Sequence, residues 1–188
     1  MADSKVSALS AVTVIGATDD LYVAVGGVSN RITGANAKIA FCPPYAKVAD
    51  QKAQNTQGGA FNTGSWVKRT LNTEVTDTDG ILTLASDQVT LLAGTYICRI
   101  RCPVWAVSLH TTRLYNSTDA AVVLTGSSMY CASGSMNESV ISGQFTIAAS
   151  KALQVEHRCS ATKTVDGLGI GTNFQTETYA EAEFWKVG

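Results

Sequence analysis

Residues 95–102 read TYICRIRC, and this stretch decides the fold class of the chain. Apolar and polar residues alternate along it, and successive side chains of a β-strand point to opposite faces. One face of such a strand carries Tyr96, Cys98, Ile100 and Cys102. The other face carries Ile97 and two arginines. The pattern therefore predicts a β-strand with two chemically different faces.

Similar short runs follow one another from residue 50 to the C-terminus, with Gly, Asn, Asp and Ser clusters between them. The runs are 61–75, 81–84, 89–92, 95–102, 109–115, 121–124, 140–147, 153–159 and 179–185. Almost no stretch has the periodicity of a helix. Many short strands at close spacing are typical of a β-sandwich or barrel, so we expect an all-β domain of about eight to ten strands.

Composition limits the classes of partner. Charged residues make up 15% of the chain and the net charge is −1. Soluble domains average roughly 25% charged residues, so we expect considerable surface to be buried between subunits; the alternative is a β domain with Thr- and Ser-rich outer faces. The chain has no basic stripe for nucleic acid and no apolar run of about 20 residues to enter a membrane. The N-terminus does not resemble a secretory signal, so we expect the protein to fold in a cytoplasm.

The N-terminal part predicts a separate hairpin. Two strand-like runs, 21–25 and 28–33, flank two glycines, and a two-residue primed turn needs the positive φ that glycine adopts freely. An isolated hairpin is only marginally stable in water, so this one needs another surface on which to pack. We therefore expect it to anchor the protein. The anchoring residues predicted are Leu21, Val23, Val25, Gly26, Gly27 and Val28.

A proline-rich connector, FCPPY at 41–45, follows the hairpin. Consecutive prolines favour an extended, stiff backbone. The sequence thus predicts an anchoring segment at residues 1–45 and a β domain at residues 46–188.

The cysteines are Cys42, Cys98, Cys102, Cys131 and Cys159. Their odd number argues against a purely intramolecular disulfide framework. Cys98 and Cys102 lie on one strand face about 13 Å apart at strand rise, beyond the limit of roughly 7 Å for a disulfide. Cys42 is the candidate for an intersubunit disulfide, because it lies in the connector where subunits would converge. The alternative is that all five remain thiols, as expected after assembly in a cytoplasm.

We find no persuasive active site in the sequence. His157 and Cys159 share a strand face and would supply zinc ligands together with His110, but the chain lacks paired Cys-x2-Cys motifs, and a packed core is the favoured interpretation. Glu181 and Glu183 share a strand face, which is more typical of a solvated surface than of a glycosidase pair. We therefore expect a non-enzymatic protein with no catalytic, cofactor-binding or metal-binding residues.

Several short motifs in the β domain are similar to a C-terminal domain common in structural proteins of tailed bacteriophages. They are DQKA at 50–53, TQGGAF at 56–61, GSW at 64–66, RTLNT at 69–73, LAGTY at 92–96, TRLYN at 112–116, FTIAASK at 145–151, HRC at 157–159 and NF at 173–174. The N-terminal KVSAL at 5–9, DLYV at 20–23 and GGV at 26–28 are similar to segments of phage tail-fibre and other virion proteins.

This resemblance implies a virion component assembled in the cytoplasm of a host bacterium. Domains of this type resemble the trimeric jelly rolls of the tumour-necrosis-factor and complement globular-head type, so it also implies an antiparallel jelly-roll sandwich and a homotrimer. The extra cysteines at positions 98, 102 and 131 depart from the usual pattern of that domain.

The sequence leaves two main functions open. The first is a homotrimeric head-decoration or neck- or collar-attached surface protein, held to other virion proteins (capsid, neck or tail) by its N-terminus. It has no heptad repeat or repetitive β-shaft from which to build a long fibre alone. The second is a receptor-binding tail-fibre or tail-tip module that recognises a host-surface glycan or protein. Exposed aromatic residues such as Tyr45, Trp105 or Tyr130 would stack on sugars, although core or interface positions are favoured for them.

Overall fold

The computed structural model describes residues 16, 18–25, 28–34, 37 and 42–188. The chain divides into two compact units, Met1–Pro43 and Pro44–Gly188.

The described part of the first unit contains the expected hairpin. Strand β1 (Asp20–Val25) pairs antiparallel with β2 (Val28–Thr33), in a register that runs from Asp20 opposite Thr33 to Val25 opposite Val28. Leu21 is half-buried. Gly26 and Gly27, to which the sequence assigns the turn, lie outside the described residues. The anchoring role of the hairpin stays a prediction.

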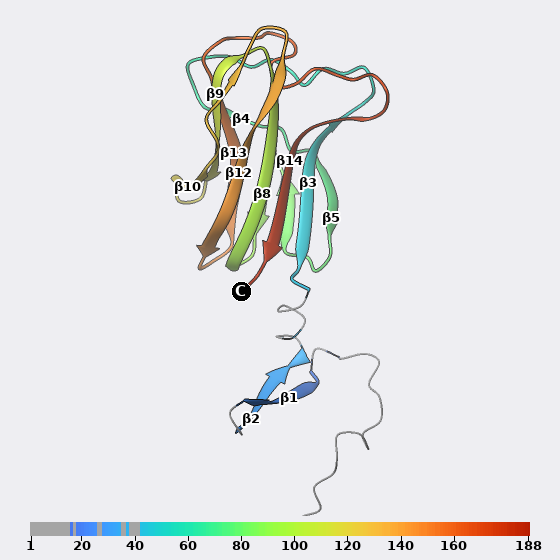
Figure 1. The fold of residues 1–188 in the computed structure, drawn as a ribbon, viewed down its shortest axis with the longest axis vertical. Helices are drawn as coiled ribbons and strands as arrows, with labels where there is room; N and C mark the ends of the chain where they lie inside the picture. The colour runs from blue at the N-terminus through green and yellow to red at the C-terminus, as the bar shows by residue number, and fades with distance from the viewer. Residues whose placement is uncertain (1–15, 17, 26–27, 35–36, 38–41) are drawn as a thin grey trace, which may run out of the picture. The chain divides into compact units, whose positions relative to one another are not determined.

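The second unit is a sandwich of two antiparallel sheets (Figure 1). One sheet has the order β12-β8-β14-β3-β5. Its strands are β12 (Met136–Ile147), β8 (Gly94–Trp105), β14 (Glu177–Lys186), β3 (Tyr45–Lys52) and β5 (Thr73–Asp77). The other sheet has the order β10-β9-β13-β7-β6, with β11 paired to β9 and β4 paired to β13. Its strands are β10 (Ala121–Thr125), β9 (Ser108–Asn116), β13 (Lys151–Cys159), β7 (Gln88–Leu91), β6 (Leu82–Ala85), β11 (Met129–Cys131) and β4 (Val67–Lys68).

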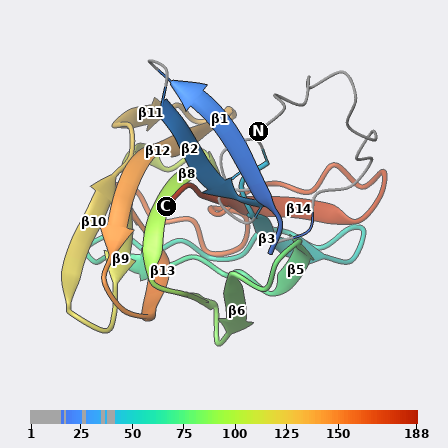
Figure 2. The ribbon, with the colours of Figure 1, turned by 90° about the horizontal axis from the view of Figure 1, so that it is seen from below.

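The view from below shows β12 beside β8 in one layer and β10 beside β9 in the other (Figure 2). The all-β jelly-roll prediction is confirmed. The described part of this unit has more strands than the eight to ten expected, because the short β4 and β11 also join the sheet. Neither is long enough to show an alternating pattern.

Most of the space between the sheets is a single apolar cluster, the main core. It includes Val48, Ile100, Leu114, Leu153 and Phe184, all 0% exposed. Each comes from a different strand and occupies the inward position of its alternating pattern. Tyr96, Cys98 and Cys102 also belong to this cluster, as the pattern of residues 95–102 predicts.

A smaller cluster, the distal core, is separate from the main core. It consists of Phe61, Val104, Val107, Cys131, Cys159 and Leu168. Between the two clusters, the inward positions of β9 and β13 hold buried polar residues in place of apolar ones. With polar residues of β3, β12 and the segment after β4, they form a polar layer that comprises Asp50, Arg69, His110, Thr112, Ser139 and His157, all buried, and the half-buried Asn137. The interior is thus apolar at both ends and polar between them.

The first and last residues of the second unit lie close together, at the same end of the sandwich. The amide of Lys186 donates to the carbonyl oxygen of Pro44 at 2.9 Å, and the amide of Thr95 donates to the carbonyl oxygen of Gly188 at 2.6 Å. The opposite end, here called the distal end, carries the turn from β8 to β9, strand β11, and the loops 53–66 and 160–176 (Figure 1).

Candidate functional site

The outer face of the five-stranded sheet is the most distinctive surface of the second unit, and we call it the β8 face. Because side chains alternate along each strand, the residues between those of the main core point outward here. The face is made by Tyr45, Lys47, Ile97, Arg99, Arg101, Glu138, Val140, Glu181, Glu183 and Trp185. It combines apolar side chains with charges of both signs.

Ion pairs link neighbouring strands across this face. Glu181 on β14 lies 2.5 Å from Nζ of Lys47 on β3 and 3.8 Å from Nη1 of Arg101 on β8. Arg101 also meets Glu138 on β12, with an Nη2–Oε2 distance of 2.9 Å. All four side chains keep at least a quarter of their surface exposed, so each pair contributes little stability by itself.

The proximal part of the face is aromatic and apolar. The rings of Tyr45 and Trp185 lie 5.2 Å apart between centroids, and the Tyr45 hydroxyl donates to Glu183 at 2.7 Å. Burial, reinforced by Glu183, raises the pKa of Tyr45 to about 12. Ile97 pairs in register with Trp185 and is 42% exposed. Tyr45, Trp185 and Ile97 together present an apolar surface to solvent.

Arg99 is the charged residue of this face that stands alone. It lies in register with Glu183 on the neighbouring strand, yet Glu183 is engaged by Tyr45. Its side chain is exposed, and no ion pair joins it to any residue that the structure describes. The face thus presents one guanidinium that is free to meet a carboxylate from another molecule.

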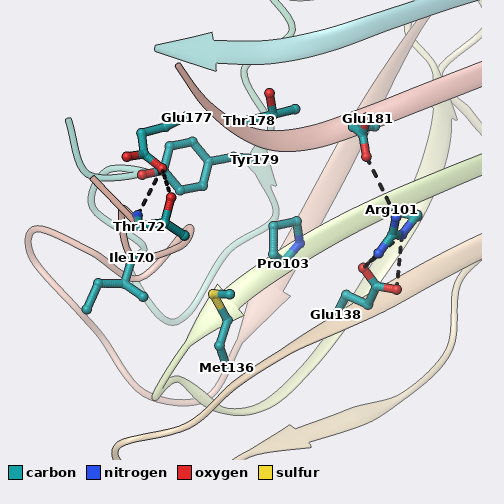
Figure 3. A pocket seen from close by; sticks show the side chains of 10 residues that line it. All are labelled: Arg101, Pro103, Met136, Glu138, Ile170, Thr172, Glu177, Thr178, Tyr179 and Glu181. Carbon is teal, nitrogen blue, oxygen red and sulfur yellow. Dashed lines mark hydrogen bonds and ion pairs between the residues drawn. The ribbon is translucent and has the colours of Figure 1, made fainter. Parts of the chain in front are cut away.

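A shallow depression of about 210 Å³ lies where the β8 face reaches the distal end (Figure 3). Arg101 and Glu138 form one side, and Met136 and Pro103 form its apolar floor. Glu177 and Tyr179 approach from β14 (Figure 3).

The carboxylates of the depression are occupied by protein donors. Glu177 accepts hydrogen bonds from Thr172 and Asn173, and the Thr172 amide above all holds the pKa of this carboxyl below its ordinary value. Glu138 binds Arg101. Both carboxylates are therefore engaged by donors of the protein itself.

The residues considered for zinc binding lie inside the sandwich. His157 is 0% exposed and His110 4% exposed, and their rings are hydrogen-bonded to each other at 3.0 Å. Cys159 is buried, and its thiol donates to the carbonyl oxygen of Ala161. Within the described residues, no three His, Cys, Asp or Glu side chains gather closely enough to hold a metal ion.

The cysteines of the second unit are buried free thiols, and Cys42 is an exposed one. Cys98 and Cys102 both lie on the inward face of β8, as predicted. Burial raises the pKa of Cys98 to about 12 and that of Cys102 to about 11, so both stay protonated at neutral pH. The intersubunit disulfide at Cys42 stays a prediction.

Of the three aromatic residues considered for sugar stacking, two are half-buried. Tyr45 is covered by Trp185, and Trp105 lies at the end of β8. Tyr130 is 62% exposed, beside the equally exposed Leu109 on the neighbouring strand.

Sequence reasoning did not find an aromatic and charged array on the outer face of the other sheet. The Arg113 guanidinium lies 4.2 Å from the centroid of Trp66 and 4.8 Å from that of Tyr115, and it also binds Glu156. These residues come from a loop and two strands that are far apart in sequence. The only signal in the sequence was their outward position in the alternating pattern.

Comparison with known proteins bears on the fold. No family model and no curated protein matches the sequence. Among solved structures, the globular domain of zebrafish complement 1qA matches with a TM-score of 0.50 and 12% identity, over 77% of this chain and 98% of that one. The fold is a jelly roll of the complement and tumour-necrosis-factor type. Murine APRIL at pH 5.0 matches with a TM-score of 0.50 and 11% identity, over 77% and 98% of the two chains.

The PRD1 vertex protein P5 is similar to the same degree. Its TM-score is 0.51 and its identity 12%, over 78% of this chain and 98% of that one. At such identities the likeness establishes the fold and leaves function to the chain's own surfaces. Within the described residues, no helix is long and apolar enough to cross a membrane.

Proposed function

We propose that this protein is a non-enzymatic structural component of a tailed-phage virion. It acts as a homotrimeric head-decoration or neck- or collar-attached surface protein, with residues 1–45 as its anchor to other virion proteins. The jelly-roll unit, Pro44–Gly188, is the displayed part. The phage-type motifs quoted above support this assignment, and a phage vertex protein, P5 of PRD1, has the same fold.

The β8 face is the observation that supports the trimer best. It is broad, and its acidic and basic side chains, apart from Arg99, are already paired or hydrogen-bonded within the chain. Ile97 supplies exposed apolar surface at its centre, and Arg99 lacks a partner within the described chain. Interfaces between permanent subunits combine these features. We assign the contacts between subunits to this face.

Light scattering on the full chain at micromolar concentration tests the assembly. We expect three chains for the unmodified protein, and a smaller species for Ile97→Asp and Arg99→Glu, because each places a carboxylate in the contact. Arg158→Glu is the matched control, since Arg158 is exposed on the other sheet. A monodisperse monomer of the unmodified protein would overturn the trimer.

Location in the particle tests the virion assignment separately. A cryo-EM map of the phage that encodes this chain should contain threefold density of the jelly roll on the head, neck or collar. Particles that lack the protein altogether would contradict a structural role. Density at a tail tip would favour the second function.

That second function is a receptor-binding module, and the distal end favours it. Large apolar side chains are exposed there, far from where the chain enters the unit: Leu109, Tyr130, Met136, Val165 and Phe174. Phe174 is 88% exposed. Binding of the isolated protein to host cells, abolished in the double variant Tyr130→Ser and Phe174→Ser, would support recognition. Equal binding to non-host cells would count against it.

A further inference from the structure

The two histidines of the polar layer are hydrogen-bonded to each other, and Asn137, which binds one of them, fixes the tautomers of both rings. Asn137 donates from Nδ2 to the carbonyl oxygen of Tyr130 at 2.6 Å, which turns its Oδ1 toward Nε2 of His110 at 2.8 Å. His110 must therefore carry its proton on Nε2 and accept on Nδ1. The donor to that Nδ1 is Nε2 of His157, at 3.0 Å.

This order leaves Nδ1 of His157 as a bare acceptor, and it has no partner among the described residues. An additional proton on the pair, beyond the one on each ring, would have to go to this atom or break one of the three bonds. The buried N–H so created would have no acceptor, and the new positive charge would have no counter-ion in contact. All three hydrogen bonds are therefore kept without a buried charge only when both rings are neutral.

The charges around the pair add to this constraint. Arg69 is 0% exposed and donates to the carbonyl oxygens of Pro103 and Leu168, at 3.2 and 3.1 Å, and not to a carboxylate. Asp50 is buried and lies 3.8 Å from Nζ of Lys52. The imidazoles therefore face a buried cation.

The carboxylates on adjoining strands are turned away from the pair. Glu156 on β13 binds Arg113, and Glu138 on β12 binds Arg101, both on outer faces of the sandwich. Phe61 covers His157 at 4.9 Å between ring centroids, and the Cys102 thiol is neutral. Burial, assisted by Arg69, lowers the pKa of both histidines, that of His157 furthest.

The polar layer also lies at a structural boundary. Main-core residues Leu114 and Val155 lie on one side of it along β9 and β13, and distal-core residues Val107 and Cys159 lie on the other. The distal core holds together the loops 53–66 and 160–176 and strand β11. In the interior of the sandwich, the polar layer thus lies between that core and the main core.

We propose that this histidine pair is an acid-operated hinge: its protonation releases the distal end of the jelly roll while the main core stays folded. The closed form holds both rings neutral, and the open form exposes them to water with an ordinary pKa of 6.5. The open form thus binds more protons below pH 6.5, and acid favours it. At pH 5.5 a histidine that stays neutral in the closed form increases the opening constant by at most about tenfold, and two such histidines by at most about a hundredfold.

Hydrogen exchange of the full chain at pH 7.5 and pH 5.5, corrected for intrinsic rates, tests the hinge. We expect protection of the segments that contain Val107, Cys131 and Leu168 to fall by about ten- to a hundredfold. Segments around Ile100 and Ala182 should change less than about twofold. Equal loss of protection in both cores would overturn the hinge, as would no change at the distal end.

Two variants show whether the histidines carry the effect. His157→Phe keeps a ring against Phe61 but cannot take a proton, so the acid effect should fall to that of one histidine. Asn137→Asp places a carboxylate against His110, which stabilises the imidazolium and should likewise shrink the effect. Arg158→Gln, an exposed neighbour on the same strand, should leave it unchanged. An undiminished acid effect in a folded Asn137→Asp or His157→Phe protein would overturn the assignment. The pH comparison on the unmodified protein decides whether the hinge exists even where a variant does not fold.

Discussion

Glu177 holds Thr172 in place through two hydrogen bonds: its Oε2 accepts from both the amide and the hydroxyl of that residue, at 2.9 and 3.1 Å. Its Oε1 accepts from the amide of Asn173 at 2.7 Å. One carboxylate at the start of β14 thus closes the loop before it, which carries the exposed Phe174.

We predict that Glu177→Gln loosens this loop. The amide of Gln offers one acceptor oxygen and no charge, so at least one of the backbone donors loses its partner. Cleavage by chymotrypsin after Phe174 should become faster under native conditions. Glu183→Gln, on the same strand but bonded only to Tyr45 here, is the control and should leave the rate unchanged. Equal rates in all three proteins would show that Glu177 does not hold the loop.

The Glu177 carboxylate should also make the closure of this loop depend on pH. Its pKa is lowered from the ordinary 4.5, chiefly by the Thr172 amide, so the unfolded or open form takes up a proton first as pH falls. The stability that these bonds contribute is fully present well above pH 4.5 and is lost as the pH falls through the lowered pKa of the folded form. Chymotrypsin is inactive there, so pepsin cleavage within residues 170–176 between pH 5 and pH 3 is the measurement. Glu177→Gln should abolish this pH dependence.

The thiols should differ sharply in reactivity. We expect iodoacetamide at pH 8 to modify Cys42 alone in the reduced, native protein, because the four other thiols are buried and the pKa of Cys98 and of Cys102 lies far above that pH. All five should react after denaturation. Mass spectrometry of peptides counts the modified sites. Rapid native labelling at Cys98 would contradict the packing of β8.

Cys42 also carries the prediction of an intersubunit disulfide. Non-reducing electrophoresis of purified particles should give a band of two linked chains that collapses on reduction and is absent in Cys42→Ser, because one thiol can join only one other chain. Migration only as a 19.7 kDa monomer, with every thiol alkylated, would leave the cysteines as packing residues.

Gly169 should be the least replaceable glycine of the distal end. Its φ is 135°, and an added Cβ would lie 2.4 Å from the ring of Tyr179. Gly64 also has positive φ, at 99°, but an added Cβ meets nothing within 4 Å. Gly169→Ala should therefore cost about 1–3 kcal/mol more than Gly64→Ala in the free energy of unfolding, measured with urea. Equal costs would show that Tyr179 moves aside freely.

Removal of residues 1–40 tests the anchor. The second unit has its own main core, so the truncated chain should remain a folded trimer. It should no longer join particles, because the hairpin β1–β2 is absent. Normal incorporation of the truncated protein would refute the anchoring role.

The sandwich could be predicted because its strands are long enough to show their alternation. In β8, buried and exposed residues follow one another from Tyr96 to Cys102, as the sequence indicates. Strands β4 and β11 have two and three residues, and pairing with their neighbours defines them, not their own pattern. No periodicity analysis finds such strands.

The polar layer was hidden for a different reason. The sequence favoured a packed core for His110 and His157, but a polar residue of an alternating pattern is expected to point outward, and the inward, fully buried position of Arg69 was not predicted. Their burial depends on carbonyl oxygens and an imidazole that other segments supply, and these contacts have no local signature. The β8 face, by contrast, could be predicted in part. The alternating pattern gave the outward positions of the glutamates of β14 and the arginines of β8, but it did not give the ion pairs between them.

The meeting of both chain ends at Pro44 and Gly188 means that the jelly roll is almost a closed ring of polypeptide. A short Gly/Ser linker would join the ends, and new termini could open at Gly134, an exposed turn residue between β11 and β12. Such a circular permutant would keep every strand pairing within the sandwich. Its termini would leave from the distal end, so that a fused cargo would sit on the surface that the natural order of the chain keeps free of ends.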